Sequence, residues 1–95
     1  MSLEFEWDED KAAENLRKHK VAFTEAATVF GDPLGITVSD PDHSSEEDRL
    51  ITVGLSIRSR LLIVSHLDLG DRVRIISARR LTKTERRVYE EKTKH

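Results

Sequence analysis

Three consecutive strand-like segments in the second half of the chain, joined only by short turns, constrain the fold most. Residues 50–57 alternate apolar and polar side chains, residues 61–67 are almost all apolar, and residues 72–78 again have the pattern of a strand. Arg58-Ser59-Arg60 separates the first two segments, and residues 67–71 form the second turn. Strands joined by such short turns pair antiparallel, and a strand that is apolar on both faces lies inside a sheet. We therefore predict an antiparallel sheet with residues 61–67 at its centre.

The first half of the chain has the pattern of a short strand, two helices and a further strand. Residues 5–7 alternate apolar and polar side chains, and Asp8 is a typical N-cap for a helix that we expect to end at about His19. Phe23 and Thr24 are the expected staple residue and N-cap of a second, mostly apolar helix that a Gly-Asp-Pro sequence ends. Residues 36–39 alternate again, which predicts another strand before an acidic loop.

The C-terminal segment is predicted to be a helix. Thr82-Lys83-Thr84-Glu85 matches a capping box, and the helix should run to about Lys92. The order β-α-α-β-β-β-β-α occupies 95 residues, the length of one domain. We therefore expect a single domain over residues 1–95 with an α+β fold: a small antiparallel sheet with two N-terminal helices and one C-terminal helix. All three helices should pack on one face, which leaves the other face for chemistry.

The composition excludes several kinds of site. The chain has no cysteine, so it has no disulfide, thiolate metal site or cysteine nucleophile. The acidic loop of residues 40–48 lacks the glycine and terminal glutamate of a calcium loop, and we expect neither a metal nor another cofactor. No apolar run approaches the roughly 20 residues of a membrane span, and the acidic start does not fit a signal peptide. We therefore expect a cytoplasmic protein that does not interact with membranes.

The net charge of −2 hides an uneven distribution of charge along the chain. Residues 1–48 carry four Lys and Arg against thirteen Asp and Glu, whereas residues 49–95 carry twelve against five. A basic half that is rich in Arg indicates a polyanionic partner, because the planar guanidinium matches phosphate. The alternative is that the two halves neutralise each other in the folded protein.

Several short motifs, in order along nearly the whole chain, resemble the BrnT family of toxins. The first is Phe5-Glu6-Trp7-Asp8-x-x-Lys11-x-x-x-Asn15-x-x-Lys18-His19. The others are the helix of residues 23–30, Asp32-Pro33-Leu34, the strand of residues 49–54, Ile75-Ile76-Ser77-Ala78-Arg79-Arg80 and Glu85-Arg86. Each motif alone is weak, but the ordered set is specific. Two positions depart from the family: Lys20 replaces a common Gly, and Asp48 stands where Glu is usual.

The resemblance implies a RelE-like fold and a toxin of a type II toxin–antitoxin system that cleaves RNA as a metal-independent endoribonuclease. It implies a BrnA-like antitoxin that neutralises the toxin, and a complex that binds operator DNA only through the antitoxin. We expect a homodimer or a heterotetramer with the antitoxin. The alternative is a non-catalytic module that binds nucleic acid or a partner protein.

Five side chains are candidates for the cleavage chemistry. The 2′-hydroxyl must lose a proton, the leaving 5′-oxygen must gain one, and the phosphorane charge must be stabilised. Arg79 and Arg80 end a strand beside a helix N-terminus, which favours phosphate, but neighbouring side chains of a strand point to opposite faces, so at most one of them faces the substrate. The helix dipole stabilises charged His19, which suits a general acid, and Glu47 is a candidate base that could also orient Arg49. Each candidate has an ordinary structural alternative. Arg79 and Arg80 could be a solvated strand end, His19 a helix-capping residue, and Glu47 with Arg49 a surface ion pair.

Further basic residues are candidates for binding the RNA backbone. Lys11 and Lys18 share one face of the first helix, and Arg72 and Arg74 have the strand parity of Arg80, which would extend a basic stripe across the sheet. The full set is Lys11, Lys18, Arg58, Arg60, Arg72, Arg74 and Lys83. Three other side chains are expected to pack within the fold instead of contacting RNA: Trp7, His66 and Tyr89.

Overall fold

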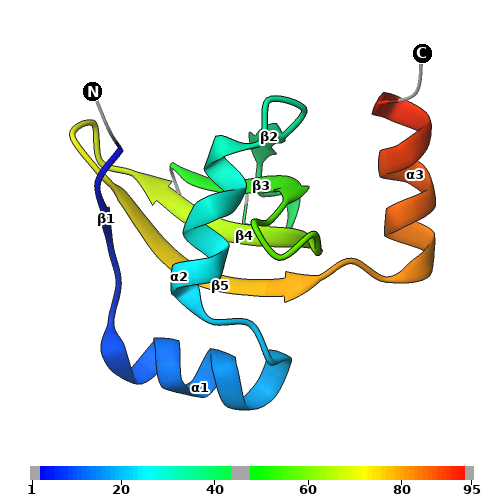
Figure 1. The fold of residues 1–95 in the computed structure, drawn as a ribbon. Helices are drawn as coiled ribbons and strands as arrows, with labels where there is room; N and C mark the ends of the chain where they lie inside the picture. The colour runs from blue at the N-terminus through cyan, green and yellow to red at the C-terminus, as the bar shows by residue number, and fades with distance from the viewer. Residues whose placement is uncertain (1–2, 44–47, 94–95) are drawn as a thin grey trace.

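The computed structural model describes residues 3–43 and 48–93 (Figure 1). Its strands are β1 (Phe5–Glu6), β2 (Ile36–Ser39), β3 (Arg49–Leu55), β4 (Leu61–Asp68) and β5 (Val73–Arg80). Its α-helices are α1 (Glu9–His19), α2 (Phe23–Thr28) and α3 (Lys83–Thr93), and short 3-10 turns follow α2 (Val29–Gly31) and β2 (Pro41–His43). The predicted order of strands and α-helices is confirmed, and the strand bounds differ from the predicted ones by no more than two residues.

The strands form one sheet in the order β1-β5-β4-β3-β2. The β2–β3, β3–β4 and β4–β5 pairs are antiparallel, and β4 is the central strand as predicted. At the outer edge β1 runs parallel to β5, with Phe5 opposite Val73, so the expectation of a purely antiparallel sheet is wrong there. No short turn joins these two strands, and therefore no turn sets their relative direction.

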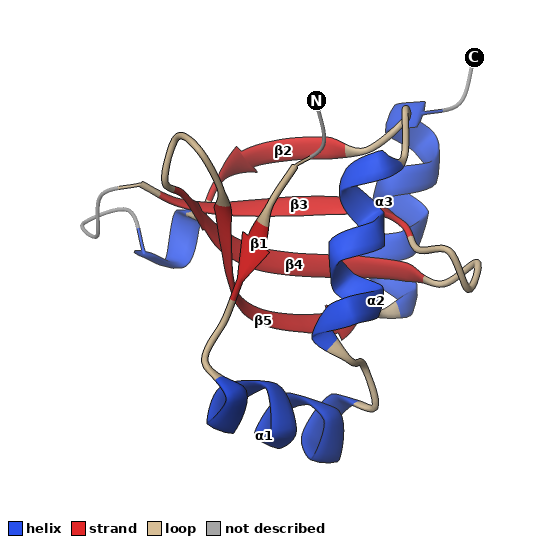
Figure 2. Ribbon diagram, turned by 60° about the vertical axis from the view of Figure 1, so that its left-hand side comes forward, coloured by secondary structure: helices blue, strands red, loops and turns tan. Residues whose placement is uncertain are grey.

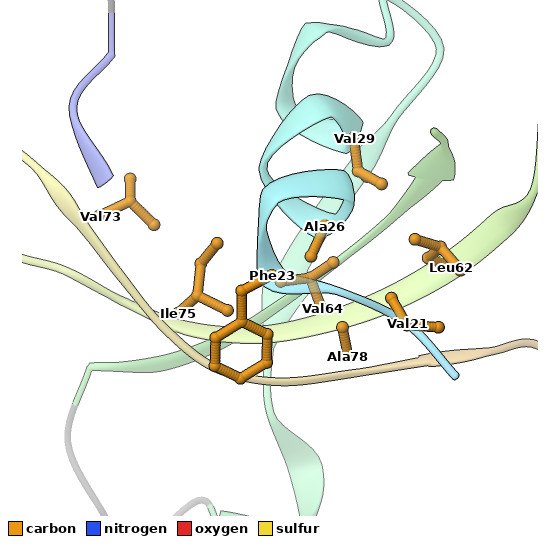
Figure 3. Packing of buried hydrophobic residues seen from close by; sticks show 9 residues of the cluster. All are labelled: Val21, Phe23, Ala26, Val29, Leu62, Val64, Val73, Ile75 and Ala78. Carbon is orange, nitrogen blue, oxygen red and sulfur yellow. The ribbon is translucent and has the colours of Figure 1, made fainter. Parts of the chain in front are cut away.

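The hydrophobic core lies between one face of the sheet, here called the first face, and the helices α1 and α2. Both helices contact β5. The buried members of the core come from α2, the segments next to it, β4 and β5 (Figure 3): Val21, Phe23, Ala26, Val29, Leu62, Val64, Val73, Ile75 and Ala78. Burial of this apolar surface is the main force that stabilises the domain.

Helix α3 lies against the opposite face, here called the second face. Val88 and Tyr89 of α3 line an apolar groove with Val53 and Ile63, whose strand positions point away from the core. In Figure 1 the strands lie between α2 and α3, and Figure 2 shows the same arrangement after a 60° turn. The expectation that all three helices pack on one face is therefore wrong, because the few apolar residues of α3 cover part of the second face.

Three side chains that we expected to pack do so. Trp7 makes an edge contact with Phe23, with ring centroids 5.9 Å apart. The imidazole of His66 is buried, and its Nε2 lies 2.8 Å from the hydroxyl of Thr52. The hydroxyl of Tyr89 donates a hydrogen bond to the carbonyl of residue 34 at 3.1 Å.

Asn15 of α1 closes the part of the β5 edge that β1 does not reach. Its Oδ1 accepts the backbone N–H of Ala78 at 3.0 Å, and its Nδ2 donates to the carbonyls of Ala78 at 2.8 Å and Val21 at 2.9 Å. The side chain is buried, and leaving one of these backbone groups unpaired would cost about 1–3 kcal/mol. These bonds fix α1 alongside β5. Helix α1 is capped at its C-terminal end by Lys20, which takes the left-handed conformation (φ 61°) that usually favours glycine.

Candidate functional site

A β-bulge in β5 decides which arginines share a face of the sheet. One residue, Ile76, is unpaired between two consecutive pairs of the β4–β5 ladder. Arg74 and Arg79 therefore both lie opposite odd-numbered residues of β4, which point to the second face, whereas Arg80 lies opposite Leu62 of the core. The predicted stripe that joins Arg74 to Arg80 is wrong, because an inserted residue reverses strand parity.

The second face carries arginines toward both ends of the sheet and serines between them. Arg49 and Arg74 flank the same residue of β4 near one end. Ser65 and Ser77 lie opposite each other in the middle, and Arg79 lies toward the other end. We call these five residues the arginine face. Guanidinium and hydroxyl groups in this arrangement are donors suited to a chain of phosphates.

A cavity of about 300 Å³ lies between α1 and β5, next to the arginine face. It is lined by Asp10, Lys11, Glu14, Asn15, Lys18, His19, Ile76 and Ser77. The cavity brings the predicted basic pair of the first helix, Lys11 and Lys18, together with the candidate acid His19, since all three line it. Ser77 belongs to both the cavity and the arginine face, so the two surfaces are continuous.

The two arginines of β5 on this face are held by acidic side chains. Arg74 donates from Nη1 to Glu6 at 2.7 Å, and Arg72 bonds the other oxygen of the same carboxylate. These partners, with the Arg72 hydrogen bond first, lower the pKa of Glu6. Arg79 donates to both carboxylate oxygens of Glu85, at 2.8 and 2.9 Å. The ion pairs of Arg72 and Arg74 with Glu6 are part of the neutralisation between chain halves that we considered as the alternative.

Glu85 belongs to the predicted capping box, which the structure confirms. Its Oε1 accepts the backbone N–H of Thr82 at 2.9 Å, and its own N–H donates to the Thr82 hydroxyl at 3.2 Å. The hydrogen bonds from Arg79 lower the pKa of Glu85 to about 2, with a further contribution from Thr82 and against the opposing effect of burial.

Acid should therefore remove the contribution of this ion pair to stability. The pKa of Glu85 is about 2 in the folded protein and about 4.5 when the side chain is unperturbed, so its contribution is complete above pH 4.5 and is lost as the pH falls toward 2. We expect Glu85→Gln, which keeps a capping side chain, to be less stable than the wild type at neutral pH. In urea unfolding, the difference between the two proteins should shrink between about pH 5 and pH 2.5. A difference that stays constant over this range would contradict the assignment.

Several predicted residues lie outside the arginine face and the cavity. Arg60 is bound within the fold: it donates to the buried carboxylate of Glu25, through Nε at 2.9 Å and also through Nη2. The other candidates in the described part of the chain that belong to neither surface are Arg58, Arg72, Arg80 and Lys83. Of these, Arg72 is next to the arginine face, since it shares the Glu6 carboxylate with Arg74. Glu47 lies outside the described residues.

Three features of this surface were not predicted from the sequence. Ser65 and Ser77 each follow a run of apolar residues within their strands, which was an available signal for a polar row. Glu85 was predicted only as part of a helix cap, because its second partner, Arg79, belongs to a different element, the strand β5. The bulge at Ile76 has no marker such as glycine in the sequence.

Among the described residues, no group of three or more His, Asp or Glu side chains is close enough to hold a metal ion. None of the described helices has the length and hydrophobicity needed to span a membrane.

Comparisons with known proteins agree with this architecture. A family model described as the ribonuclease toxin, BrnT, of type II toxin–antitoxin systems matches residues 7–85. The crystal structure of the Brucella abortus ribonuclease toxin, BrnT, is similar with a TM-score of 0.68 and 20% sequence identity, and the match covers 86% of this chain and all of that one. A search of curated proteins gave no match. The structural likeness shows a shared α+β fold, and the family match extends over most of the sequence. The chain therefore belongs to the BrnT family of ribonuclease toxins of type II toxin–antitoxin systems.

Proposed function

We propose that this protein is a metal-independent endoribonuclease that binds RNA across the arginine face and the adjoining cavity. The observation that carries the proposal is the bulge at Ile76, because it puts Arg74 and Arg79 on one face beside the cavity that contains His19. An RNA backbone needs several cationic donors in a row, and cleavage needs a proton donor next to them. These surfaces supply both within one continuous region.

Each residue has a distinct role in this proposal. Arg79 stabilises the charge on the phosphorane, and His19, at the C-terminus of α1, protonates the leaving 5′-oxygen. Lys11 and Lys18 bind neighbouring phosphates from the same helix. Removal of the proton from the 2′-hydroxyl is assigned to Glu47, which precedes Arg49 in the sequence.

The remaining expectations from the family complete the proposal. The fold is RelE-like, the protein works in the cytoplasm, and the antitoxin that inhibits it is BrnA-like. The complex is a heterotetramer or contains a toxin homodimer, and it contacts operator DNA only through the antitoxin. What supports these points is the family match over residues 7–85.

The test is cleavage by the protein without its antitoxin. Induced expression of the toxin alone should stop growth and fragment cellular RNA, and co-expression with the antitoxin should prevent both. Purified protein should cleave RNA equally well with and without EDTA, while an Arg79→Ala protein purified in parallel controls for contaminating nucleases. RNA that stays intact under both conditions would overturn the proposal. Intact RNA that nevertheless binds the protein would support the non-catalytic alternative.

A further inference from the structure

We infer that Glu85 is a positioning residue of the cleavage site, which holds Arg79 so that one edge of its guanidinium is presented to a phosphate of the RNA. The inference rests on the proposed function, since it takes Arg79 as the group that stabilises the phosphorane. It adds a residue from α3 to a site otherwise built from α1 and the sheet.

The hydrogen bonds of Arg79 leave one particular edge of the guanidinium open. The group has five N–H donors in a plane. One donor from each Nη goes to Glu85, at 2.8 and 2.9 Å, and Nη1 also donates to the carbonyl of Arg80 at 3.2 Å. The two donors that remain are on Nε and Nη2, and no acceptor in the described part of the chain takes a bond from them. These two N–H groups lie on the same edge and point the same way, so together they form a fork that matches two phosphate oxygens.

The carboxylate that holds Arg79 is itself fixed to the backbone. Glu85 is bonded to Thr82 in both directions across the first turn of α3. A guanidinium on a long side chain would otherwise lose rotamer freedom when it binds phosphate. Glu85 and the Arg80 carbonyl already restrain the Arg79 side chain, so its conformational entropy is lost when the protein folds. The two open N–H groups are therefore oriented before the substrate binds. The Arg79 side chain is 41% exposed, so the restraint does not bury it.

The opposite reading is that Glu85 takes the place of the phosphate and blocks Arg79. Against it, Glu85 occupies only the end of the guanidinium and leaves a complete two-donor edge. The two readings predict opposite changes in the rate of cleavage. Removing a positioning residue lowers the rate of cleavage, whereas removing a blocking residue raises it.

The test is a double-mutant cycle on RNA cleavage with Glu85→Ala, Arg79→Ala and both together. Glu85→Ala should lower kcat by about tenfold with a smaller change in KM, because a misplaced group costs transition-state stabilisation more than substrate binding. In the Arg79→Ala background the same change should have almost no further effect. Glu91→Ala removes the same charge from an exposed position of α3 and should leave kcat within about twofold of the wild type.

The outcomes separate this inference from the proposed function. Faster or unaltered cleavage by Glu85→Ala overturns the positioning role, as does an effect that adds fully to that of Arg79→Ala. Circular dichroism and urea unfolding identify any variant that is simply unfolded. If the wild type cleaves nothing, the proposed function has failed. Affinity for a 2′-O-methyl RNA, which cannot be cleaved, then tests Glu85: weaker binding by both single variants without additivity supports positioning, and unaltered binding by Glu85→Ala rejects it.

Discussion

Arg60→Met is expected to lower the free energy of unfolding by about 3–5 kcal/mol, because it leaves a buried carboxylate without its counter-charge. The Glu25 side chain is only 5% exposed. It accepts hydrogen bonds from Arg60, through Nε at 2.9 Å and through Nη2, and from the hydroxyl of Ser56 at 2.7 Å. The hydrogen bonds from Arg60 are the main cause of its lowered pKa, so the carboxylate stays ionised at neutral pH. Domains of this size have a total stability of about 5–15 kcal/mol, and this single substitution would remove a large share.

Urea unfolding followed by Trp7 fluorescence measures the effect, since Trp7 packs on Phe23 at the start of α2, the helix that carries Glu25. Arg58→Met is the matched control: it removes the same charge from an exposed position of the same turn and should cost less than about 0.5 kcal/mol. A double variant that replaces both Glu25 and Arg60 with Met should recover most of the loss, because an apolar pair of similar volume needs no counter-charge. Equal stabilities of the Arg58 and Arg60 variants would show that the pair does not stabilise the fold.

Arg60 also shows why the distribution of charge along the sequence predicted function less well than the pattern of apolar residues predicted strands. Arg60 was predicted to bind RNA because it belongs to a basic half of the chain, but its partner, Glu25, lies 35 positions earlier. No local pattern connects these two residues. The pattern of apolar residues, in contrast, is set within a strand. The segments of β3, β4 and β5 were predicted from it, β3 by alternation and β4 by a nearly continuous apolar run. Likewise the Asp8 cap and the Thr82 capping box depend on neighbours two or three positions away, and both formed as predicted. The predicted Thr24 cap is wrong, since α2 already begins at Phe23 and its N-cap is Ala22.

The faces of the elements were harder to predict than the elements themselves. Alternation assigns a side chain to a face only while the strand is regular, and Ile76 interrupts β5 just before its two terminal arginines. The parallel pairing of β1 and the position of α3 depend on how distant segments meet, which no turn in the sequence determines. Arg74 and Arg79 were predicted as site residues, but their position on the same face therefore follows only from the register of the sheet.

Arg79→Ala should lower kcat/KM for RNA cleavage by about 10²- to 10³-fold, the usual effect of removing one group that stabilises transition-state charge. Arg80 is the matched control, because it has the same charge at the next position and lies opposite Leu62 instead of on the arginine face. We expect Arg80→Ala to reduce kcat/KM by about threefold at most, through a weaker attraction of the polyanion.

The contrast between the two variants tests the geometry and not the charge alone. General attraction for RNA depends on net charge and would fall equally in both proteins, with the same change in salt dependence. A site defined by the bulge requires a large loss of activity at Arg79 and a small one at Arg80, in proteins that circular dichroism and urea unfolding show to be folded under the conditions of the assay. Arg79→Lys sharpens the test, since it keeps the charge but removes both the fork to Glu85 and the open two-donor edge, and its cleavage should stay closer to that of Arg79→Ala than to that of the wild type. Equal losses at positions 79 and 80, or full activity of Arg79→Lys, would contradict a phosphate site on the second face.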